Sequence, residues 1–568
     1  MEIESGEEEL MARVIAIGEQ NFRTIRENNY FYVDKTEFIE DWWLKTGATA
    51  TLITRPRRFG KTLMMDTVRE FFTAEDRDQE RLFSGLDVWE NETMRRTAGT
   101  IPVISLTWSG IKGQNYWVVR KDILRTIAET YRHFDFVAES EKVDPVLRSR
   151  LKNFSFQSRD ESEDPAALRD LCIALHQYYG VKPIVLLDEY DTPLQEAWLA
   201  GYWDDLVGFM KKLMNFTFKS NTSLARGIIT GVTRISKESI FSDLNNPMVV
   251  TTTSDVFQTS FGFTEAEVFA ALDEYGISDR EKVKAWYDGF TFGSVTDIYN
   301  PWSITSFLEA RKFATYWANT SDNALVNELI RRGNRLIKTD MEELLSGRTI
   351  RTPIREEISF RDLDATAVSI WSLLLVTGYL RVVGYDEESD TYELCLTNLE
   401  VKRTMEAMIR LWFDAAGNTN YLDFVNAMQA GDTEAMNVTL NALTAKVFSY
   451  FDTDGREPER FYHGFVLGLL VTQKNRWRVK SNRESGYGRY DVMLIPVDSA
   501  KDDAFVLEFK VRRTASEKTL AESAQAALQQ IEAKHYDAEL LADGIAKERI
   551  RKFGIAFDGK VALVLGRE

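Results

Sequence analysis

The segment TLITRPRRFGKTLMMDTVREFF, residues 51–72, constrains the fold of this chain more than any other stretch. An apolar run leads through a polar turn into an amphipathic helical pattern, with Gly60, Lys61 and Thr62 at the junction. A strand, loop and helix in this order can bind phosphate, because helix N–H groups and the lysine contact its oxygens while the threonine hydroxyl ligates Mg²⁺. The usual pattern has a glycine five residues before the Gly-Lys pair, where this chain has Arg55. The segment alone therefore leaves the assignment open.

Two later segments supply the partners that a phosphate-binding loop needs. In PIVLLDEYD, residues 183–191, four apolar residues precede Asp188 and Glu189. We expect Asp188 to orient the magnesium shell and Glu189 to act as base for the attacking water. In GIITGVTRIS, residues 227–236, Arg234 follows another apolar run and could stabilise charge that develops during hydrolysis. The alternative interpretations are a buried strand with a solvated acidic turn and a surface arginine after a strand.

Length and composition predict several packed domains. With 568 residues and 44% hydrophobic content, the chain is expected to form roughly three or four domains. No apolar run approaches the roughly 20 residues that cross a bilayer, and the N-terminus MEIESGEEEL is acidic where a secretory signal is basic. These features predict a cytoplasmic protein without membrane contact. The two cysteines, Cys172 and Cys395, are too few for a disulfide framework or a cysteine zinc site.

The charge distribution points to the last fifth of the chain as the part that touches nucleic acid. The net charge of -18 argues against a protein that coats nucleic acid by general electrostatics. Residues 455–568 contain 20 Lys and Arg against 17 Asp and Glu, a net charge of +3, which leaves -21 for everything before them. Ordinary variation in surface charge explains this difference equally well on charge alone.

The order of patterns divides the chain into three predicted domains. Apolar runs alternate with helical patterns at first, which predicts a doubly wound α/β domain over residues 1–260. Residues 261–454 are mostly helical in pattern and are expected to form a lid and connecting region, for which a winged helix is one option. The segment DTDGREPER is polar and contains Gly and Pro, and strand patterns return after it, so a third domain is expected over residues 455–568.

Acidic residues and a lysine come together in the predicted third domain. RYDVMLIPV, residues 489–497, and AFVLEFKV, residues 504–511, read as two strands of a hairpin. Glu508 and Lys510 share a face because they are two residues apart, and folding about residues 500 and 501 brings Asp491 beside them. Such a set can hold a divalent ion while the lysine positions or activates water against a phosphodiester.

Two further observations bear on this predicted cluster. Glu459 lies one helical turn before His463 and could complete the acidic set. The alternative interpretation of Glu-Phe-Lys in a strand is a cross-strand ion pair.

Several of these stretches together resemble one bacterial family. IAIGEQNFRTIRENNYFYVDKTEFI, RPRRFGKT, LLDEYDTPL, GIITGVTRISKESIFSDLNN, FGFTEAEV and YNPWSI look like the AAA-ATPase-like family, whose members often carry a C-terminal PD-(D/E)XK nuclease-like domain. That family's phosphate loop is likewise Arg-Pro-Arg-Arg-Phe-Gly-Lys-Thr/Ser, so Arg55 agrees with it. The order Glu459, Asp491, Glu508-Phe509-Lys510 and then a helix with Gln530 and Tyr536 resembles the nuclease core.

The resemblance implies an α/β fold with a P-loop NTPase sheet, a mainly helical region and a restriction-endonuclease-like α/β domain. It implies ATP and Mg²⁺ as cofactors, with Mn²⁺ as an alternative at the nuclease site. The implied nucleotide contacts are Arg58, Phe59, Gly60, Lys61, Thr62 and Asp188, and the implied metal ligands are Thr62, Asp188, Asp491 and Glu508.

Two classes of function follow from this architecture. In the first, an ATPase module controls a magnesium-dependent nuclease that acts on nucleic acid, with DNA favoured, in DNA processing or defence. In the second, the ATPase is a STAND-type switch, and the C-terminal domain only binds nucleic acid or a protein. A homo-oligomer is compatible with both.

Overall fold

The computed structural model describes residues 12–74, 78–154, 164–219, 221–235, 247–317, 324–355, 357–358, 366–414, 421–451, 465, 468, 472–485, 488–512, 519–559 and 561–567. The chain divides into two compact units. Unit 1 comprises Met1–Leu325 and Arg351–Val401, and unit 2 comprises Val326–Ile350 and Lys402–Glu568. The predicted domain boundaries at residues 260 and 454 stay predictions.

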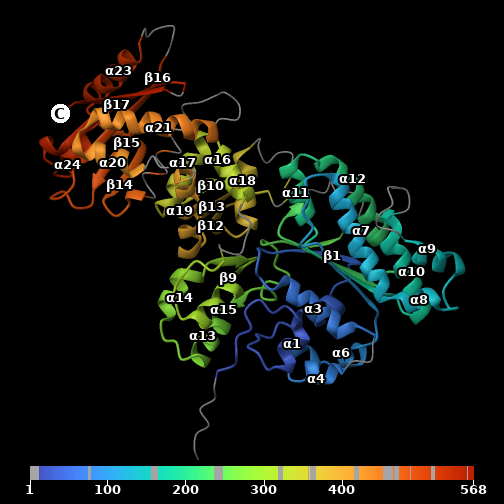
Figure 1. The fold of residues 1–568 in the computed structure, drawn as a ribbon. Helices are drawn as coiled ribbons and strands as arrows, with labels where there is room; N and C mark the ends of the chain where they lie inside the picture. The colour runs from blue at the N-terminus through green and yellow to red at the C-terminus, as the bar shows by residue number, and fades with distance from the viewer. Residues whose placement is uncertain are drawn as a thin grey trace, which may run out of the picture. The chain divides into compact units, whose positions relative to one another are not determined.

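A five-stranded parallel sheet forms the centre of unit 1 (Figure 1). Its strand order is β2–β3–β4–β1–β6. The strands are β1 (Ala50–Thr54), β2 (Val103–Thr107), β3 (Ile184–Asp188), β4 (Arg226–Gly231) and β6 (Met248–Val250). Every residue of β1 and of β3 is buried, as expected for parallel strands covered on both faces. The predicted doubly wound α/β fold is confirmed.

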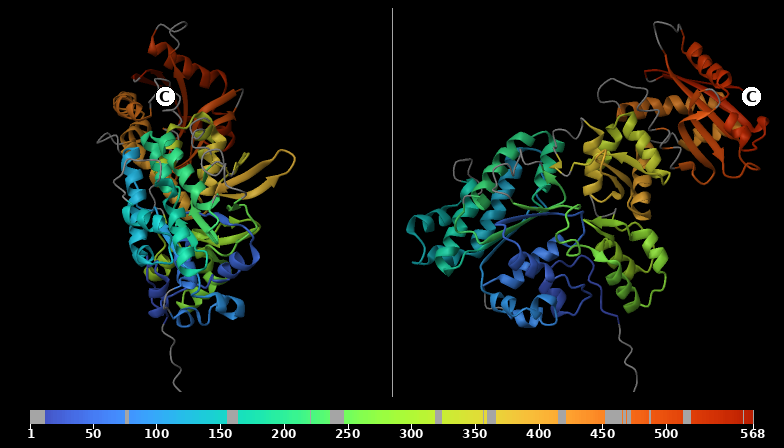
Figure 2. Two further views of the ribbon diagram at one scale, coloured as in Figure 1. Left: turned by 90° about the vertical axis from the view of Figure 1, so that its right-hand side faces the viewer. Right: turned by 180° about the vertical axis from the view of Figure 1, so that it is seen from behind.

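Helices cover both faces of this sheet (Figures 1 and 2). One face packs against α1 (Phe22–Glu27), α3 (Lys61–Phe72) and α4 (Gln79–Phe83) in a single apolar cluster that includes Ile53 and Leu186. The other helices of the region are α2 (Glu37–Glu40), α5 (Asp87–Glu90), α6 (Glu92–Thr97), α7 (Tyr116–His133), α8 (Asp135–Glu139), α9 (Pro145–Asn153), α10 (Ala167–Tyr179), α11 (Thr192–Ala200) and α12 (Trp203–Met214).

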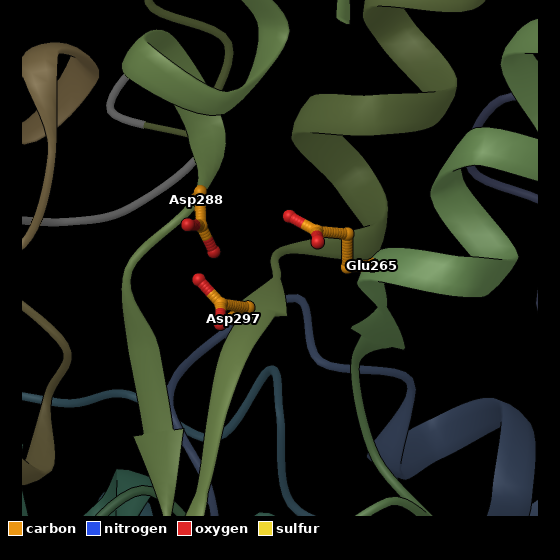
Figure 3. A group of neighbouring side chains, drawn as sticks. All are labelled: Glu265, Asp288 and Asp297. Carbon is orange, nitrogen blue, oxygen red and sulfur yellow. The ribbon is translucent and has the colours of Figure 1, made fainter. Parts of the chain in front are cut away.

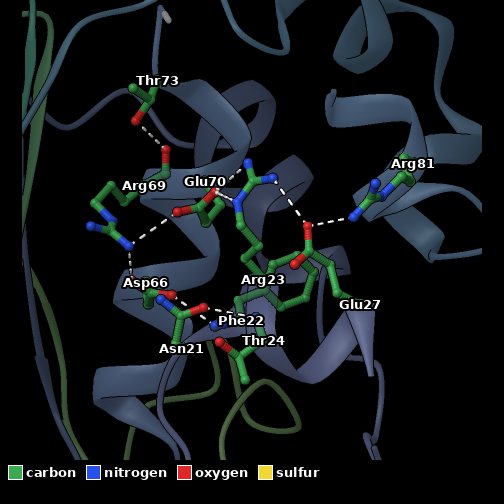
Figure 4. Close-up of polar contacts among 10 residues, drawn as sticks. All are labelled: Asn21, Phe22, Arg23, Thr24, Glu27, Asp66, Arg69, Glu70, Thr73 and Arg81. Carbon is green, nitrogen blue, oxygen red and sulfur yellow. Dashed lines mark hydrogen bonds and ion pairs between the residues drawn. The ribbon is translucent and has the colours of Figure 1, made fainter. Parts of the chain in front are cut away.

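Polar contacts fix α3, the helix that starts in the Gly-Lys-Thr segment, against α1 (Figure 4). The N–H of Phe22 donates to Asp66 Oδ2 at 2.8 Å, and Arg23 pairs with the buried Glu70 at 3.0 Å. On the far side of α1, Arg81 pairs with Glu27 at 2.5 Å. Helix α3 is therefore held in place by polar contacts with α1 as well as by the packing of its apolar face in the core.

The remainder of unit 1 contains small sheets among helices. Strands β7 (Phe263–Thr264), β9 (Val295–Tyr299) and β8 (Phe290–Phe292) form an antiparallel sheet beside α13 (Glu265–Glu274), α14 (Arg280–Tyr287) and α15 (Pro301–Ala310). The capping box of Thr264 and Glu267 starts α13. Strand β5 (Arg234–Ile235) pairs in parallel with β11 (Glu357–Ile358).

A second three-stranded sheet has the order β10–β13–β12. Its strands are β10 (Ile350–Thr352), β12 (Leu380–Asp386) and β13 (Thr391–Leu396), and the apolar helix α18 (Ala367–Val376) precedes the β12–β13 hairpin. The mainly helical character predicted for residues 261–454 is confirmed, with these strands interspersed. Helix and hairpin in this order agree with the winged-helix option, which stays a prediction.

Unit 2 has its own mixed sheet in the order β14–β15–β16–β17–β18. The strands are β14 (Trp477–Ser485), β15 (Gly488–Pro496), β16 (Ala504–Val511), β17 (Ile550–Asp558) and β18 (Val561–Arg567). Only the β16–β17 pair is parallel. The helices further along the chain are α16 (Ala324–Arg332), α17 (Arg335–Leu345), α19 (Leu399–Asp414), α20 (Tyr421–Ala430), α21 (Thr433–Phe451), α23 (Leu520–Ala533) and α24 (Ala538–Ala542). None of the described helices is long and apolar enough to span a bilayer.

The predicted hairpin of β15 and β16 is present, with its centre one residue earlier than expected. Val492 pairs with Leu507 and Leu494 pairs with Phe505, which centres the turn on residues 499 and 500. Asp498 sets this turn by accepting a hydrogen bond from the N–H of Ala500 at 3.0 Å. Extended by one residue pair beyond Val492 and Leu507, this register places Asp491 opposite Glu508.

Candidate active sites

The loop between β1 and α3 has the backbone geometry of a phosphate-binding loop. Gly60 has φ +82°, a conformation that disfavours any side chain, although a Cβ there would meet open space. Helix α3 begins at Lys61, and its first internal bond runs from the N–H of Met64 to the carbonyl of Gly60. The N–H groups of Lys61, Thr62 and Leu63 therefore have no acceptor inside the helix and can donate to an anion at its N-terminus.

Lys61 and Thr62 meet the acidic end of β3. The buried Lys61 Nζ donates to the carbonyl oxygens of Arg55 at 2.9 Å and Pro56 at 2.8 Å. Thr62 Oγ1 donates to Asp188 Oδ2 at 2.7 Å, and Thr230 at the end of β4 donates to the other oxygen of the same carboxylate. Burial lowers the pKa of Lys61, while Asp188 acts in the opposite direction. The structure thus brings together three of the residues predicted for nucleotide and metal.

Glu189 lies next to this cluster in a strained backbone conformation. Its φ is +55°, which is rare for a residue with a side chain and is often found at functional sites. Burial raises the pKa of its carboxyl group, and the charge of Asp188 adds to the rise. Thr192 Oγ1 donates to Glu189 Oε2 at 3.1 Å. A carboxylate with a raised pKa beside the phosphate loop is suited to the role of a general base.

Asp191, the other acid of the segment, has a structural role. Its Oδ2 accepts hydrogen bonds from the N–H groups of Val232 and Thr233 at 3.0 and 2.8 Å and from the Thr233 hydroxyl at 2.7 Å. Gln195 adds a fourth donor at 3.1 Å. Asp191 is fully engaged in fixing the chain after β4, which leaves Glu189 as the better placed base.

The arginines of the loop segment have different environments. Arg55 is fully buried, donates to the carbonyls of Thr251 and Phe257, and lies 4.4 Å from the centre of the Phe292 ring. Burial lowers the pKa of Arg55 to about 9. Arg58 lies 4.2 Å from the ring centre of Trp302. Arg55 is therefore a packed residue beneath the loop.

Two other predicted residues contact neighbouring elements in the described structure. Phe59 is buried in a cluster with Phe290, Phe292 and Ile298. Arg234 pairs with Glu357 at 2.5 Å, alongside the β5–β11 pairing. The contacts described for these two residues are to protein groups, and their predicted roles toward nucleotide stay predictions.

Asn300 of the YNPWSI segment and Trp317, which follows α15, contact the loop between β1 and α3, and sequence reasoning gave neither residue a role. The carbonyl of Arg57 accepts hydrogen bonds from Asn300 Nδ2 and from Trp317 Nε1, both at 3.2 Å. Asn300 also caps α15 through its Oδ1. The signal in the sequence was the concentration of aromatic and polar residues in a short turn, without any indication of what they touch.

In unit 2, Asp491, Glu508 and Lys510 lie at one end of the β15–β16 pair. Asp491 Oδ2 accepts a hydrogen bond from the N–H of Phe509 at 2.8 Å. Gln530 of α23 bridges the other two, because its Oε1 accepts from Lys510 Nζ at 2.9 Å and its Nε2 donates to Glu508. Tyr536 contacts the same amide at 3.0 Å. The hairpin and the helix together hold two carboxylates and a lysine at one site.

Glu508 has the properties of a metal ligand. Only 4% of its surface is exposed, and its Oε2 has no hydrogen-bond partner among the described residues. Burial raises the pKa of Glu508 to about 8, with a further contribution from Asp491. A buried carboxylate oxygen without a donor, next to a second carboxylate, fits a divalent cation. Glu459, predicted to complete the acidic set, lies outside the described residues.

A third group of acids, Glu265, Asp288 and Asp297, surrounds a lysine in unit 1. Their carboxylate oxygens lie within 4.8 Å of one another (Figure 3). Lys284 Nζ lies 2.5 Å from Glu265, 3.1 Å from Asp297 and 3.9 Å from Asp288. The cluster therefore has a cation of its own, and we interpret it as an ion-pair network that joins α13, α14 and β9.

Comparisons with known proteins match one family to each of the two regions that contain these sites. Residues 16–241 match the family described as "Predicted AAA-ATPase", and residues 457–565 match the PD-(D/E)XK nuclease superfamily. The chain thus combines an AAA-ATPase-like domain with a PD-(D/E)XK nuclease-like domain, as its motifs implied. It is also 26% identical to the "Uncharacterized protein in vnfD 5'region" of Azotobacter chroococcum mcd 1, over 97% of this chain and 98% of that protein.

The carboxylate cluster predicts a pH dependence of stability. Burial raises the pKa of Asp288 to about 7, with a contribution from its contact with Asp297. Because this is above the unfolded value, the stability that Asp288 contributes in its protonated form is lost as pH rises from the unfolded pKa through 7. Asp288→Asn stays neutral, so its melting temperature relative to wild type should increase between pH 5 and pH 8.

The measurement is thermal unfolding of both proteins across this range. Asp386→Asn serves as the control, since Asp386 is exposed and its pKa is lowered by hydrogen bonds from Ser389 and Glu388. It is ionised throughout the range, so its difference from wild type should not change with pH. A pH-independent difference for Asp288→Asn as well would contradict the prediction.

Proposed function

We propose that this protein binds and hydrolyses ATP in its N-terminal domain and uses that domain to control a Mg²⁺-dependent nuclease at its C-terminus. The substrate is nucleic acid, with DNA favoured, and the process is DNA processing or defence in the cytoplasm. The observation that supports this most directly is the pair of sites described above, each with two carboxylates, a lysine and a matching family domain.

The proposed nucleotide site uses the described contacts as follows. Lys61 would exchange the carbonyls of Arg55 and Pro56 for oxygens of the β- and γ-phosphates. Thr62 and Asp188 already lie in contact and would hold Mg²⁺, which neutralises phosphate charge when bound. Glu189 would take a proton from the attacking water. Arg234 would leave Glu357 to reach the phosphates, where it would stabilise the charge that develops during hydrolysis.

In the proposed nuclease site, the two carboxylates and the lysine have different roles. Asp491 and Glu508 would bind the divalent ion, Mg²⁺ or Mn²⁺, which polarises the phosphodiester. Lys510, held by Gln530, would position or activate the attacking water. Glu508 must lose its proton to serve as a ligand. Its Oε2 could then bind the ion, because no group among the described residues donates a hydrogen bond to this oxygen.

The charge of the C-terminal region favours a modest affinity for nucleic acid. Residues 455–568 carry a net charge of +3 on an otherwise acidic chain. Binding should therefore weaken clearly between low and physiological salt concentration, because each contact of a basic side chain with a phosphate releases a counterion that salt restores. The alternative function, a STAND-type switch with a C-terminal domain that only binds, is the outcome if cleavage is never observed. Both alternatives allow a homo-oligomer.

The first prediction concerns nucleotide binding. Lys61→Ala removes a buried ammonium group that no other residue in the loop can replace in position, so most of the affinity for ATP and Mg²⁺ should be lost. Isothermal calorimetry measures this directly. Lys45→Ala, at an exposed lysine of the same unit, is the control and should bind as wild type does. Unchanged affinity in Lys61→Ala would overturn the assignment of the loop.

The second prediction separates the two acids after Asp188. Glu189→Gln keeps the shape of the side chain but removes its basicity, so hydrolysis should slow by about 10²-fold or more while ATP still binds. Asp191→Asn should instead lower the melting temperature, because an amide lacks the negative charge that strengthens the hydrogen bonds from Val232 and Thr233. Steady-state phosphate release and thermal unfolding distinguish these effects. Wild-type turnover in Glu189→Gln would point to a switch that does not hydrolyse ATP, or to another base.

The third prediction concerns cleavage. Asp491→Asn or Glu508→Gln should abolish Mg²⁺-dependent cleavage by removing ligand charge, and Lys510→Ala should impair it while metal binding persists. All three should bind ATP as wild type does, since the residues lie in a separate unit. Asp543→Asn, at an exposed acid of the same unit, is the matched control.

The assay covers single- and double-stranded DNA and RNA, with Mg²⁺ or Mn²⁺, and with or without ATP. Cleavage by wild type that persists in the Asp491 and Glu508 variants would show that the site is misplaced. If wild type cuts none of these substrates, the switch function replaces the nuclease function.

A further inference from the structure

The phosphate loop is held from outside by two side chains at a single carbonyl. Arg57 lies between Pro56, whose carbonyl binds Lys61, and Arg58, which stacks on Trp302. Its own carbonyl accepts from Asn300 and Trp317. A change of conformation at Arg57 when phosphate replaces the carbonyls at Lys61 would therefore be transmitted through these two hydrogen bonds.

The two donors are themselves fixed by one buried carboxylate. Glu400 Oε1 accepts from the backbone N–H of Trp317 at 2.7 Å, and Oε2 accepts from Ser303 Oγ at 2.8 Å. Ser303 lies in the first turn of α15, where its N–H donates to Asn300 Oδ1 at 3.2 Å. Asn300, Trp317 and Glu400 are each no more than 2% exposed. Buried polar groups with satisfied partners form rigid networks, so these residues can move only together.

Glu400 lies where the chain passes from one unit to the other. It is in the first turn of α19, Leu399–Asp414. Unit 1 ends at Val401, and the rest of the helix from Lys402 belongs to unit 2. The network thus connects the phosphate loop to a helix that continues into the unit with the nuclease-like sheet.

We propose that Asn300, Trp317 and Glu400 are positioning residues of the nucleotide site that couple the state of the phosphate loop to α19. The proposal rests on the proposed ATP-binding function and names the residues through which it acts on the rest of the chain. In physical terms, ATP and α19 both bias one network with two arrangements, which is the requirement for coupling between distant sites.

The central test uses Trp317→Phe, which keeps the ring and removes the Nε1 donor. Trp42→Phe is the matched control, because it loses a buried indole hydrogen bond to Thr51 in the same unit, away from Arg57. Hydrogen exchange of the peptide covering Leu399–Leu411 is followed by mass spectrometry with and without ATP and Mg²⁺, alongside ATP affinity and thermal unfolding.

In wild type and in Trp42→Phe, ATP should change the exchange rate of this peptide several-fold. In Trp317→Phe this response should disappear, while ATP affinity falls by only about five- to tenfold, the effect of one lost hydrogen bond. Assays are run at ATP concentrations that saturate each variant. If Trp317→Phe does not fold, Asn300→Ser gives the same readout, since serine also caps a helix but is too short to reach Arg57.

The outcomes separate this inference from the function on which it rests. Absence of ATP binding in wild type would overturn the proposed function, and the coupling with it. If wild type binds ATP but the peptide does not respond, or if Trp317→Phe responds like wild type, the coupling is wrong and the ATPase proposal stands. Equal loss of response in Trp42→Phe would show a general effect of a lost core contact and would also overturn the coupling.

Discussion

The carboxylate of Asp188 is the contact on which the ATPase-like sheet and its site both depend. A buried charge is stable only when donors surround it, and here the hydroxyls of Thr62 and Thr230 supply them. Thr62 lies in the helix after β1, and Thr230 lies at the end of β4. Their hydrogen bonds to Asp188 therefore hold together the carboxyl ends of the neighbouring parallel strands β3, β4 and β1. The same arrangement places Lys61 nearby. Fold and chemistry therefore share one set of interactions, as expected at the carboxyl edge of such a sheet.

The two candidate sites have similar arrangements of charged side chains. Each places two carboxylates side by side in a partly buried position with one lysine, and in each burial raises the pKa of one acid, with a further contribution from the charge of the other. In unit 1 the affected residue is Glu189, and in unit 2 it is Glu508. Such pairs are common where a cation or a proton is to be bound, because the repulsion is relieved when either arrives.

Much of this arrangement was predictable because it follows from local sequence. A strand, a loop and a helix around Gly-Lys-Thr located Lys61 and Thr62, and an apolar run that ends in acids located Asp188 and Glu189 at the same edge of the sheet. Alternation along the β15–β16 hairpin placed Glu508 and Lys510 on one face. The hairpin centre was wrong by one residue, since Asp498 rather than the middle of the polar turn sets the register.

Other contacts could not be predicted in this way. Asn300 and Trp317 lie 243 and 260 residues after Arg57, and no periodic pattern links positions so far apart. The burial of Arg55 was equally hidden, because an arginine in a polar turn ordinarily predicts exposure.

Arg55 gives the loop a property that a glycine at this position would not provide. A glycine leaves the backbone free to sample many conformations, whereas Arg55 is anchored at the end of β1 by carbonyls on another segment and by the ring of Phe292. The start of the loop is therefore ordered before any ligand arrives, and less conformational entropy is lost on closing around phosphate. The acceptors of Arg55 are backbone carbonyls, which any residue supplies, so the constraint falls on the path of the chain after β6 and on the aromatic ring in β8 rather than on the side chains of Thr251 and Phe257.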